Sequence, residues 1–119
     1  MPMNSSTIKQ GDIVILDIPF SDFSETKKRP TLVISSTTYN AKSQDVVVAS
    51  ITSQLSGSLF RVDLLQNDLL EGKLKQDSSI KVDHPVTAHK KIIEMRIGSV
   101  TSKKMNQVKS KISELYELP

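Results

Sequence analysis

The sequence contains no cysteine, and aromatic residues make up only 4% of its 119 positions. The absence of cysteine excludes disulfide bonds, thiolate metal sites and a cysteine nucleophile, and it agrees with a reducing cytosol. The few phenylalanines and tyrosines are expected mostly in the core. The chain therefore lacks the aromatic platforms on which binding modules for single-stranded nucleic acid usually stack bases.

Other absences narrow the function classes further. No apolar run approaches the ~18 residues of a membrane-spanning helix, and no secretory leader precedes the first strand-like segment, so we expect a cytoplasmic protein without a membrane partner. The four glycines are scattered, which excludes a glycine-rich phosphate loop. His84 and His89 have no clustered partners of the metal-binding type. We therefore expect neither a metal site nor a cofactor.

The net charge of +3 is a weak argument for a nucleic-acid partner. Residues 1–88 contain nine Lys and Arg against ten Asp and Glu, while residues 89–119 contain seven against three. The C-terminal excess is typical of lysines on a solvated helix face. The compact cluster Lys27-Lys28-Arg29 is a stronger local indication, because three cations follow one another directly.

The length and the apolar pattern predict one domain over residues 1–119 with strand character in its first half. The near-continuous apolar runs predict strands buried on both faces or strongly curved, as in a small barrel. Two later segments alternate between apolar and polar residues, with Phe60, Val62 and Leu64 expected inward in the first. The expected strands are 13–16, 31–34, 46–49, 59–64, 79–83 and 96–100.

The C-terminal segment changes to a helical period. Met105, Val108, Ile112, Leu115 and also Tyr116 follow the spacing of one helical face. Lys104, Lys109, Lys111 and Glu114 fall elsewhere on the wheel, and Thr101 or Ser102 suits the N-cap. Five or six short strands followed by one amphipathic helix predict an α+β fold.

Two positions next to the expected strands are suited to phosphate chemistry. Arg29 belongs to the cluster Lys27–Pro30, which follows the polar segment 21–26 and which we expect to be a charged loop tip. Its planar guanidinium can donate two parallel hydrogen bonds to a phosphate. Pro30 restricts Arg29 to extended backbone. Thr52 ends an apolar strand, where its hydroxyl could donate to phosphate. From the residues alone, a surface charge at Arg29 and turn-forming hydroxyls near Thr52 are the better explanation of the pattern.

Five short motifs follow one another along the chain: Gly11–Val14, Pro19–Asp22, Lys28–Ser35, Tyr39-Asn40 and Val48–Ser53. Their order resembles the MazF/PemK family of toxin endoribonucleases from bacterial toxin–antitoxin systems. The resemblance implies a small SH3-like β-barrel with a curved antiparallel sheet and a C-terminal helix. It also implies a homodimer that cleaves single-stranded RNA sequence-specifically without a metal, leaving a 2′,3′-cyclic phosphate and a 5′-hydroxyl, and that is inhibited by a cognate acidic antitoxin.

The resemblance also implies roles for individual residues. The family's catalytic arginine and threonine correspond to Arg29 and Thr52, and Glu25 lies near its acidic loop position as a candidate base or loop-ordering group. The neighbouring residues Lys27, Lys28, Ser53 and Gln54 are expected to bind RNA.

The segment from Asp83 to His89 departs from the family pattern, because an arginine and an aspartate that many relatives have there are missing. A subgroup uses a basic residue and an aspartate in this region, which correspond to Lys81 and Asp83 as further RNA-binding candidates. His84 could act as an acid near neutral pH. We expect it instead to be structural or solvent-facing.

Two other function classes remain open on sequence grounds. Relatives of the CcdB type share the fold but poison DNA gyrase by protein contact, and such a protein has no need of Arg29 and Thr52 as a pair. An RNA-binding module without cleavage is the third reading. A neighbouring upstream gene for a small acidic protein would indicate a toxin of either kind.

Overall fold

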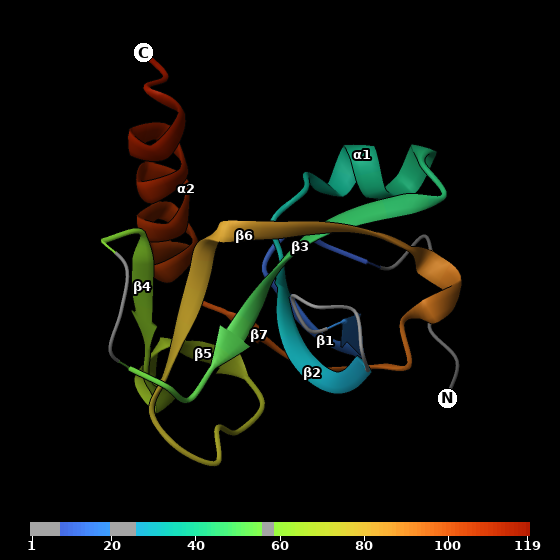
Figure 1. Ribbon diagram of the computed structural model, residues 1–119, viewed down its shortest axis with the longest axis horizontal. Helices are drawn as coiled ribbons and strands as arrows, with labels where there is room; N and C mark the ends of the chain where they lie inside the picture. Colours follow the sequence, from blue (N-terminus) through green and yellow to red (C-terminus); the bar gives the residue numbers. More distant parts are fainter. Residues whose placement is uncertain (1–7, 20–25, 56–58) are drawn as a thin grey trace.

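The protein folds as a curled antiparallel sheet with one long helix at the C-terminus (Figure 1). The structure is a computed structural model that describes residues 8–19, 26–55 and 59–119. In chain order the elements are β1 (Asp12–Pro19), β2 (Thr26–Val33), α1 (Thr37–Lys42), β3 (Asp45–Thr52), β4 (Arg61–Leu64), the 3₁₀ turn η2 (Gln66–Asp68), β5 (Leu69–Glu71), β6 (Ser78–His89), the 3₁₀ turn η3 (Lys90–Ile92), β7 (Met95–Val100) and α2 (Ser102–Tyr116).

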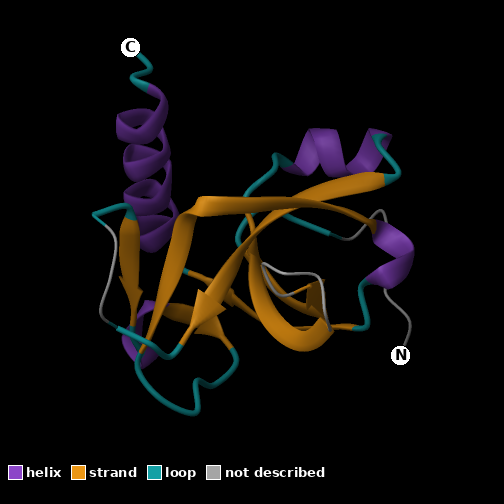
Figure 2. Ribbon diagram, in the orientation of Figure 1, coloured by secondary structure: helices purple, strands orange, loops and turns teal. Residues whose placement is uncertain are grey.

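The strands form one seven-stranded sheet in the order β4-β6-β3-β2-β1-β7-β5. Every neighbouring pair is antiparallel, and the sheet curls so strongly that its two ends approach each other (Figure 2). The predicted α+β fold, with a curved antiparallel sheet and a terminal helix, is confirmed. The sequence pattern missed the short strand β5, so the sheet has more strands than expected.

Consecutive apolar residues in the central strands are buried on both faces of the sheet, as their near-continuous runs predict. Successive side chains of a strand point to opposite faces, so Ile13 joins one core cluster while Val14 and Leu16 join another. In β2, Leu32 likewise belongs to the first cluster and Val33 to the second. The curled sheet therefore has a core on each side, and α2 covers part of the first one through its contacts with β4 and β6.

Helix α2 has the predicted cap and the predicted buried face. The hydroxyl of Thr101 accepts a hydrogen bond from the Lys104 N–H at 3.2 Å. Met105 and Val108 are buried. The prediction was wrong for Tyr116, which is 58% exposed because it lies in the last turn, beyond the end of the sheet. Within the described parts of the chain, no helix is long and apolar enough to cross a membrane.

Lys104 departs from the expected solvent face of α2. Its side chain is buried, and its ammonium donates to the backbone oxygen of Asp63 at 2.8 Å and lies 3.4 Å from the carboxylate of Asp68. A buried lysine needs such partners, since an unpaired ammonium inside a protein is costly. The helical wheel identified Lys104 as polar but did not indicate that β4 and η2 supply oxygen atoms to it.

The sequence had suggested that the cationic cluster Lys27-Lys28-Arg29 lies at a loop tip. The structure shows instead that these three residues belong to strand β2. The pairing of β1 with β2 continues past the apolar residues, with Lys28 opposite Asp17 and Arg29 opposite Leu16. The strand is longer than its apolar run because backbone hydrogen bonding does not require apolar side chains. The cluster is therefore held by a paired strand.

Candidate functional site

A groove of about 510 Å³ lies between strand β2, the end of β3 and the segment 73–76 that connects β5 to β6. We call it the basic groove. It contains Arg29 and Thr52, the two residues that the sequence singled out for phosphate chemistry. Its apolar lining is aliphatic and comes from β1, β3, β5, β7 and the 73–76 segment: Ile13, Ile15, Ile51, Leu69, Leu74 and Ile97.

The charged side chains among the described residues that line the groove are all of one sign. Among its described lining residues, five carry a positive side chain and none is Asp or Glu. Three of the cations come from β2 and two from the 73–76 segment, so positive charge lies on two walls: Lys27, Lys28 and Arg29 on one, Lys73 and Lys75 on the other. A cleft lined by one sign of charge concentrates ligands of the opposite sign. The lining of the basic groove is therefore suited to an anionic ligand.

Pro30 explains why Arg29 and Thr52 lie at an opening. The pairing of β2 with β3 ends at Thr31 opposite Ser50, and Pro30 follows with no backbone N–H to continue the ladder. Beyond that point the two strands diverge (Figure 1). Arg29 and Thr52 each lie two residues past the last pair, one on each strand, and both line the groove between them.

The Thr52 side chain is oriented by the turn that ends β3. Its Oγ1 accepts a hydrogen bond from the Gln54 N–H at 3.1 Å. The Arg61 side chain in turn donates from Nη1 to the Gln54 carbonyl oxygen at 2.7 Å. Because Oγ1 accepts this hydrogen bond through a lone pair, the hydroxyl O–H of Thr52 can still donate a hydrogen bond to a ligand in the groove.

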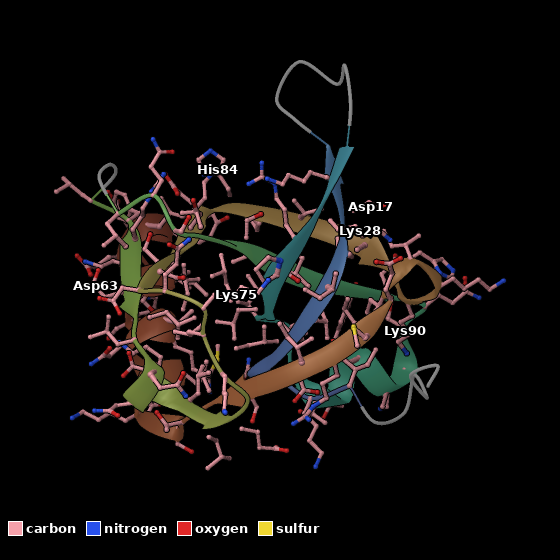
Figure 3. All side chains as sticks on the ribbon, turned by 90° about the horizontal axis from the view of Figure 1, so that it is seen from below. Asp17, Lys28, Asp63, Lys75, His84 and Lys90 are labelled. Atoms are coloured by element: carbon pink, nitrogen blue, oxygen red, sulfur yellow. The ribbon has the colours of Figure 1, made fainter. Side chains whose placement is uncertain are left out.

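Lys28 lines the groove but already forms an ion pair within the protein. Its ammonium forms an ion pair with the carboxylate of Glu94, and Asp17 lies opposite it on β1 (Figure 3). The hydrogen bond to Glu94 raises the pKa of Lys28, and the charges of Glu94 and Asp17 act in the same direction. Lys28 therefore remains charged at neutral pH, with two carboxylates at the rim of the basic groove.

The second cationic wall is anchored by the side chain of Gln66. Its Oε1 accepts from the Leu74 N–H at 2.8 Å, and its Nε2 donates to the Gly72 carbonyl oxygen at 3.2 Å. Gly72 has a φ of +96°, and a side chain there would lie 2.5 Å from the Ile97 carbonyl oxygen. These constraints position Lys73 and Lys75, and Figure 3 shows Lys75 between its own segment and β2.

Sequence reasoning missed Lys73, Leu74, Lys75 and Gln76, all of which line the groove. The available signal was the Lys-Leu-Lys-Gln run directly after Gly72. Two lysines separated by one apolar residue can lie on the same side of an extended segment while the apolar side chain packs inward. Leu74 does pack against the first core cluster.

The other predicted site residues divide into two groups. Lys27, Lys28 and Ser53 line the groove beside the proposed catalytic pair, whereas Gln54, Lys81 and Asp83 do not. His84 lies 3.0 Å from the carboxylate of Asp83 on an exposed part of β6, outside the groove.

The candidate base Glu25 lies outside the described residues. Within residues 8–19, 26–55 and 59–119, no three His, Asp or Glu side chains gather in a way that could hold a metal ion.

One of the comparisons with known proteins identifies a family for this chain. A family model described as "PemK-like, MazF-like toxin of type II toxin-antitoxin system" matches residues 9–116. No curated protein matches the sequence.

Similar solved structures include an endoribonuclease from a mycobacterial species, with 21% identity, a TM-score of 0.76 and coverage of 98% of this chain and 96% of the other. The toxin MazF-mt6 of Mycobacterium tuberculosis is 22% identical, with a TM-score of 0.73 and coverage of 91% and 98%. A MazE-MazF structure from Deinococcus radiodurans is 20% identical, with a TM-score of 0.75 and coverage of 94% and 98%. These likenesses show a shared fold, and the matched family model shows that the chain belongs to the PemK-like, MazF-like toxins of type II toxin–antitoxin systems.

Proposed function

We propose that this toxin is an endoribonuclease that cleaves single-stranded RNA sequence-specifically and without a metal ion. The observation that carries the proposal is that Arg29 and Thr52 line one groove whose described lining has five cations and no carboxylate. A polyanion binds such a groove by releasing its own counterions. Membership of the toxin family and the fold shared with solved endoribonucleases support the same activity.

In the proposed reaction the ribose 2′-hydroxyl oxygen attacks the adjacent phosphorus atom, and the bond from phosphorus to the 5′-oxygen breaks. The products are a 2′,3′-cyclic phosphate and a 5′-hydroxyl. Negative charge builds on the non-bridging oxygens during the attack, and the guanidinium of Arg29 offsets it through two parallel hydrogen bonds. The hydroxyl of Thr52 donates a further hydrogen bond to the same phosphate.

Proton transfer requires a base for the 2′-hydroxyl and an acid for the leaving 5′-oxygen. The described lining residues include no Asp, Glu or His, so we retain Glu25 as the candidate base. In the sequence, Glu25 immediately precedes β2, the strand that carries Arg29. Glu25→Gln should then lower the cleavage rate, because an amide cannot accept the proton of the 2′-hydroxyl.

The groove suits a single strand better than a duplex. Its aliphatic lining, which includes Ile15 and Ile97, can contact the faces of unstacked bases while the two cationic walls hold phosphates. A duplex hides those base faces within its own stack. Ser53 at the end of β3 and Gln76 on the opposite wall can donate to and accept from base edges, which gives the groove a means of preferring certain sequences.

The proposal includes a homodimer and a cognate acidic antitoxin. One of the solved structures that share this fold is described as an endoribonuclease in complex with its cognate antitoxin. An acidic segment that folds on binding could cover both cationic walls of the basic groove and exclude RNA.

The activity is tested directly with purified protein and a mixed-sequence single-stranded RNA in excess EDTA. We expect discrete fragments that end in a cyclic phosphate and begin with a 5′-hydroxyl. RNA with 2′-O-methyl groups throughout should stay intact, because it lacks the attacking hydroxyl. Cleavage that stops in EDTA would refute metal independence, and cleavage of the methylated RNA would refute the proposed nucleophile.

Binding should weaken with salt, and the second wall should contribute to the salt dependence. For single strands, the slope of log affinity against log salt changes by about 0.7 per phosphate contact. Changing both Lys73 and Lys75 to Gln should therefore flatten the slope by roughly 1.4 if each lysine contacts one phosphate. The measurement is fluorescence anisotropy with the uncleavable methylated RNA.

The matched control changes two other lysines to Gln, Lys90 and Lys91 of η3, which do not line the groove. Lys90 lies on the far side of β2 from Lys75 (Figure 3). This control removes the same net charge and should leave the slope nearly unchanged. Equal slopes for the two double variants would show that the 73–76 segment makes no phosphate contact of its own.

A further inference from the structure

One cation of the basic groove, Lys28, has a carboxylate bound to it. The ammonium of Lys28 is paired with Glu94, and both side chains are largely exposed, at 62% and 42% respectively. Asp17, opposite Lys28 on β1, adds a second negative charge nearby. The carboxylate of Glu94 is therefore bound to a cation that lines the groove.

Glu94 is held at this position by its backbone. Its N–H donates to the Ile15 carbonyl oxygen at 2.9 Å, which fixes the chain between η3 and β7 beside β1. The side chain takes no part in that hydrogen bond, so its charge can be removed without disturbing the strand contact.

A carboxylate and a phosphate compete for the same ammonium, because both are anions that accept its hydrogen bonds. Lys28 has a flexible stem and three donors. RNA that reaches Lys28 must either displace Glu94 or share the ammonium with it, and in both cases the phosphate meets the repulsion of a nearby carboxylate. An exposed ion pair is weak enough to be exchanged in this way.

We propose that Glu94 acts as an internal competitor of RNA at Lys28 and lowers the affinity of the basic groove for its substrate. This inference rests on the proposed function, since it takes the phosphates of single-stranded RNA as the incoming ligand. The competitor limits how tightly the groove holds any RNA, substrate or product, through one residue that lies outside the catalytic pair.

The test is the affinity of the Glu94→Gln variant for the uncleavable methylated RNA at low salt. We expect binding about two- to fivefold tighter than in the parent, which corresponds to the range measured for exposed ion pairs. In a background with Lys28→Met, the same change should have a much smaller effect, because the contested ammonium is gone. Unchanged or weaker binding by Glu94→Gln would overturn the proposal, and so would an equal gain in both backgrounds.

Glu114→Gln is the matched control. It also removes a carboxylate from an exposed ion pair, with Lys111 on α2 at 3.2 Å, but neither residue lines the basic groove. The RNA affinity of Glu114→Gln should equal that of the parent within experimental error. If Glu114→Gln instead bound RNA as tightly as Glu94→Gln does, the gain in affinity would come from the change in net charge alone. If the parent itself neither binds nor cleaves RNA, the proposed function fails. If the parent does both and Glu94→Gln gains nothing, only the competitor inference fails.

Discussion

Replacing Arg29 with alanine should lower the rate of RNA cleavage by about 10²–10³, because one preorganised donor at a developing oxyanion typically contributes that much. Arg29 lies in a paired strand opposite Leu16, so its backbone is fixed before the substrate arrives. The variant should retain the parent's melting temperature, since Arg29 is not part of either core cluster. The measurement is single-turnover cleavage of a labelled RNA.

Two further variants separate geometry from charge. Arg29→Lys keeps the positive charge but loses the planar fork, and it should recover little of the lost rate. Thr52→Ala should lose less than Arg29→Ala, because it removes a neutral donor, whereas Thr52→Ser keeps the hydroxyl and should remain close to the parent. Full activity in Arg29→Lys would show that charge alone is required at this position.

Expression in growing bacteria distinguishes an RNA-cleaving toxin from one that poisons DNA gyrase. The parent should arrest growth while cellular RNA is cut, and Arg29→Ala should permit growth. If Arg29→Ala stops growth as effectively as the parent while RNA remains intact, the nuclease proposal fails and gyrase becomes the target to test.

Replacing Val108 with aspartate should remove most or all of the stability of the fold. Val108 is fully buried in the core cluster that joins α2 to the sheet. Burying a carboxylate there without a partner costs several kcal/mol, on the order of the roughly 5–15 kcal/mol that stabilises a small domain. Thermal unfolding followed by circular dichroism should show a large fall in melting temperature or no folded baseline.

The neighbouring position supplies the control for this prediction. Gln107 is exposed, so Gln107→Asp introduces the same side chain one residue away and should cost about 0.5 kcal/mol through helix propensity alone. Ile112, partly buried at the edge of the cluster, should fall between the two when changed to Asp. Similar melting temperatures for all three variants would mean that α2 does not pack as described.

The helix could be predicted closely because its signals are local. The cap at Thr101 and the spacing of Met105 and Val108 depend only on neighbours in the chain and on the helical period. The burial of Lys104 could not be predicted, because its partners Asp63 and Asp68 are brought to it by the packing of β4 and η2. The helical period of a sequence indicates which face of the helix is apolar. It does not indicate which polar side chain will be buried against oxygen atoms of other elements.

The candidate site could be predicted only in part, because only some of its residues belong to motifs that can be recognised in the sequence. Arg29 and Thr52 came from a resemblance in motifs, and both line the groove. Lys73 and Lys75 reach it through a turn at Gly72 and a side-chain anchor at Gln66, neither of which has a short-range signature. The assignment of Lys27–Arg29 to a loop failed because strand pairing extended beyond the apolar run.

The sheet order has a consequence for how the toxin is made. Strand β1 is among the first elements in the chain, yet one of its two neighbours in the sheet is β7, the last strand. Ile97 of that strand lines the basic groove together with Ile13 and Ile15 of β1. A ribosome therefore synthesises Arg29, Thr52 and both lysine walls before the strand that completes the groove. The growing polypeptide contains the five described cations of the basic groove before it can assemble the groove, so the proposed RNA site cannot form until β7 has been synthesised.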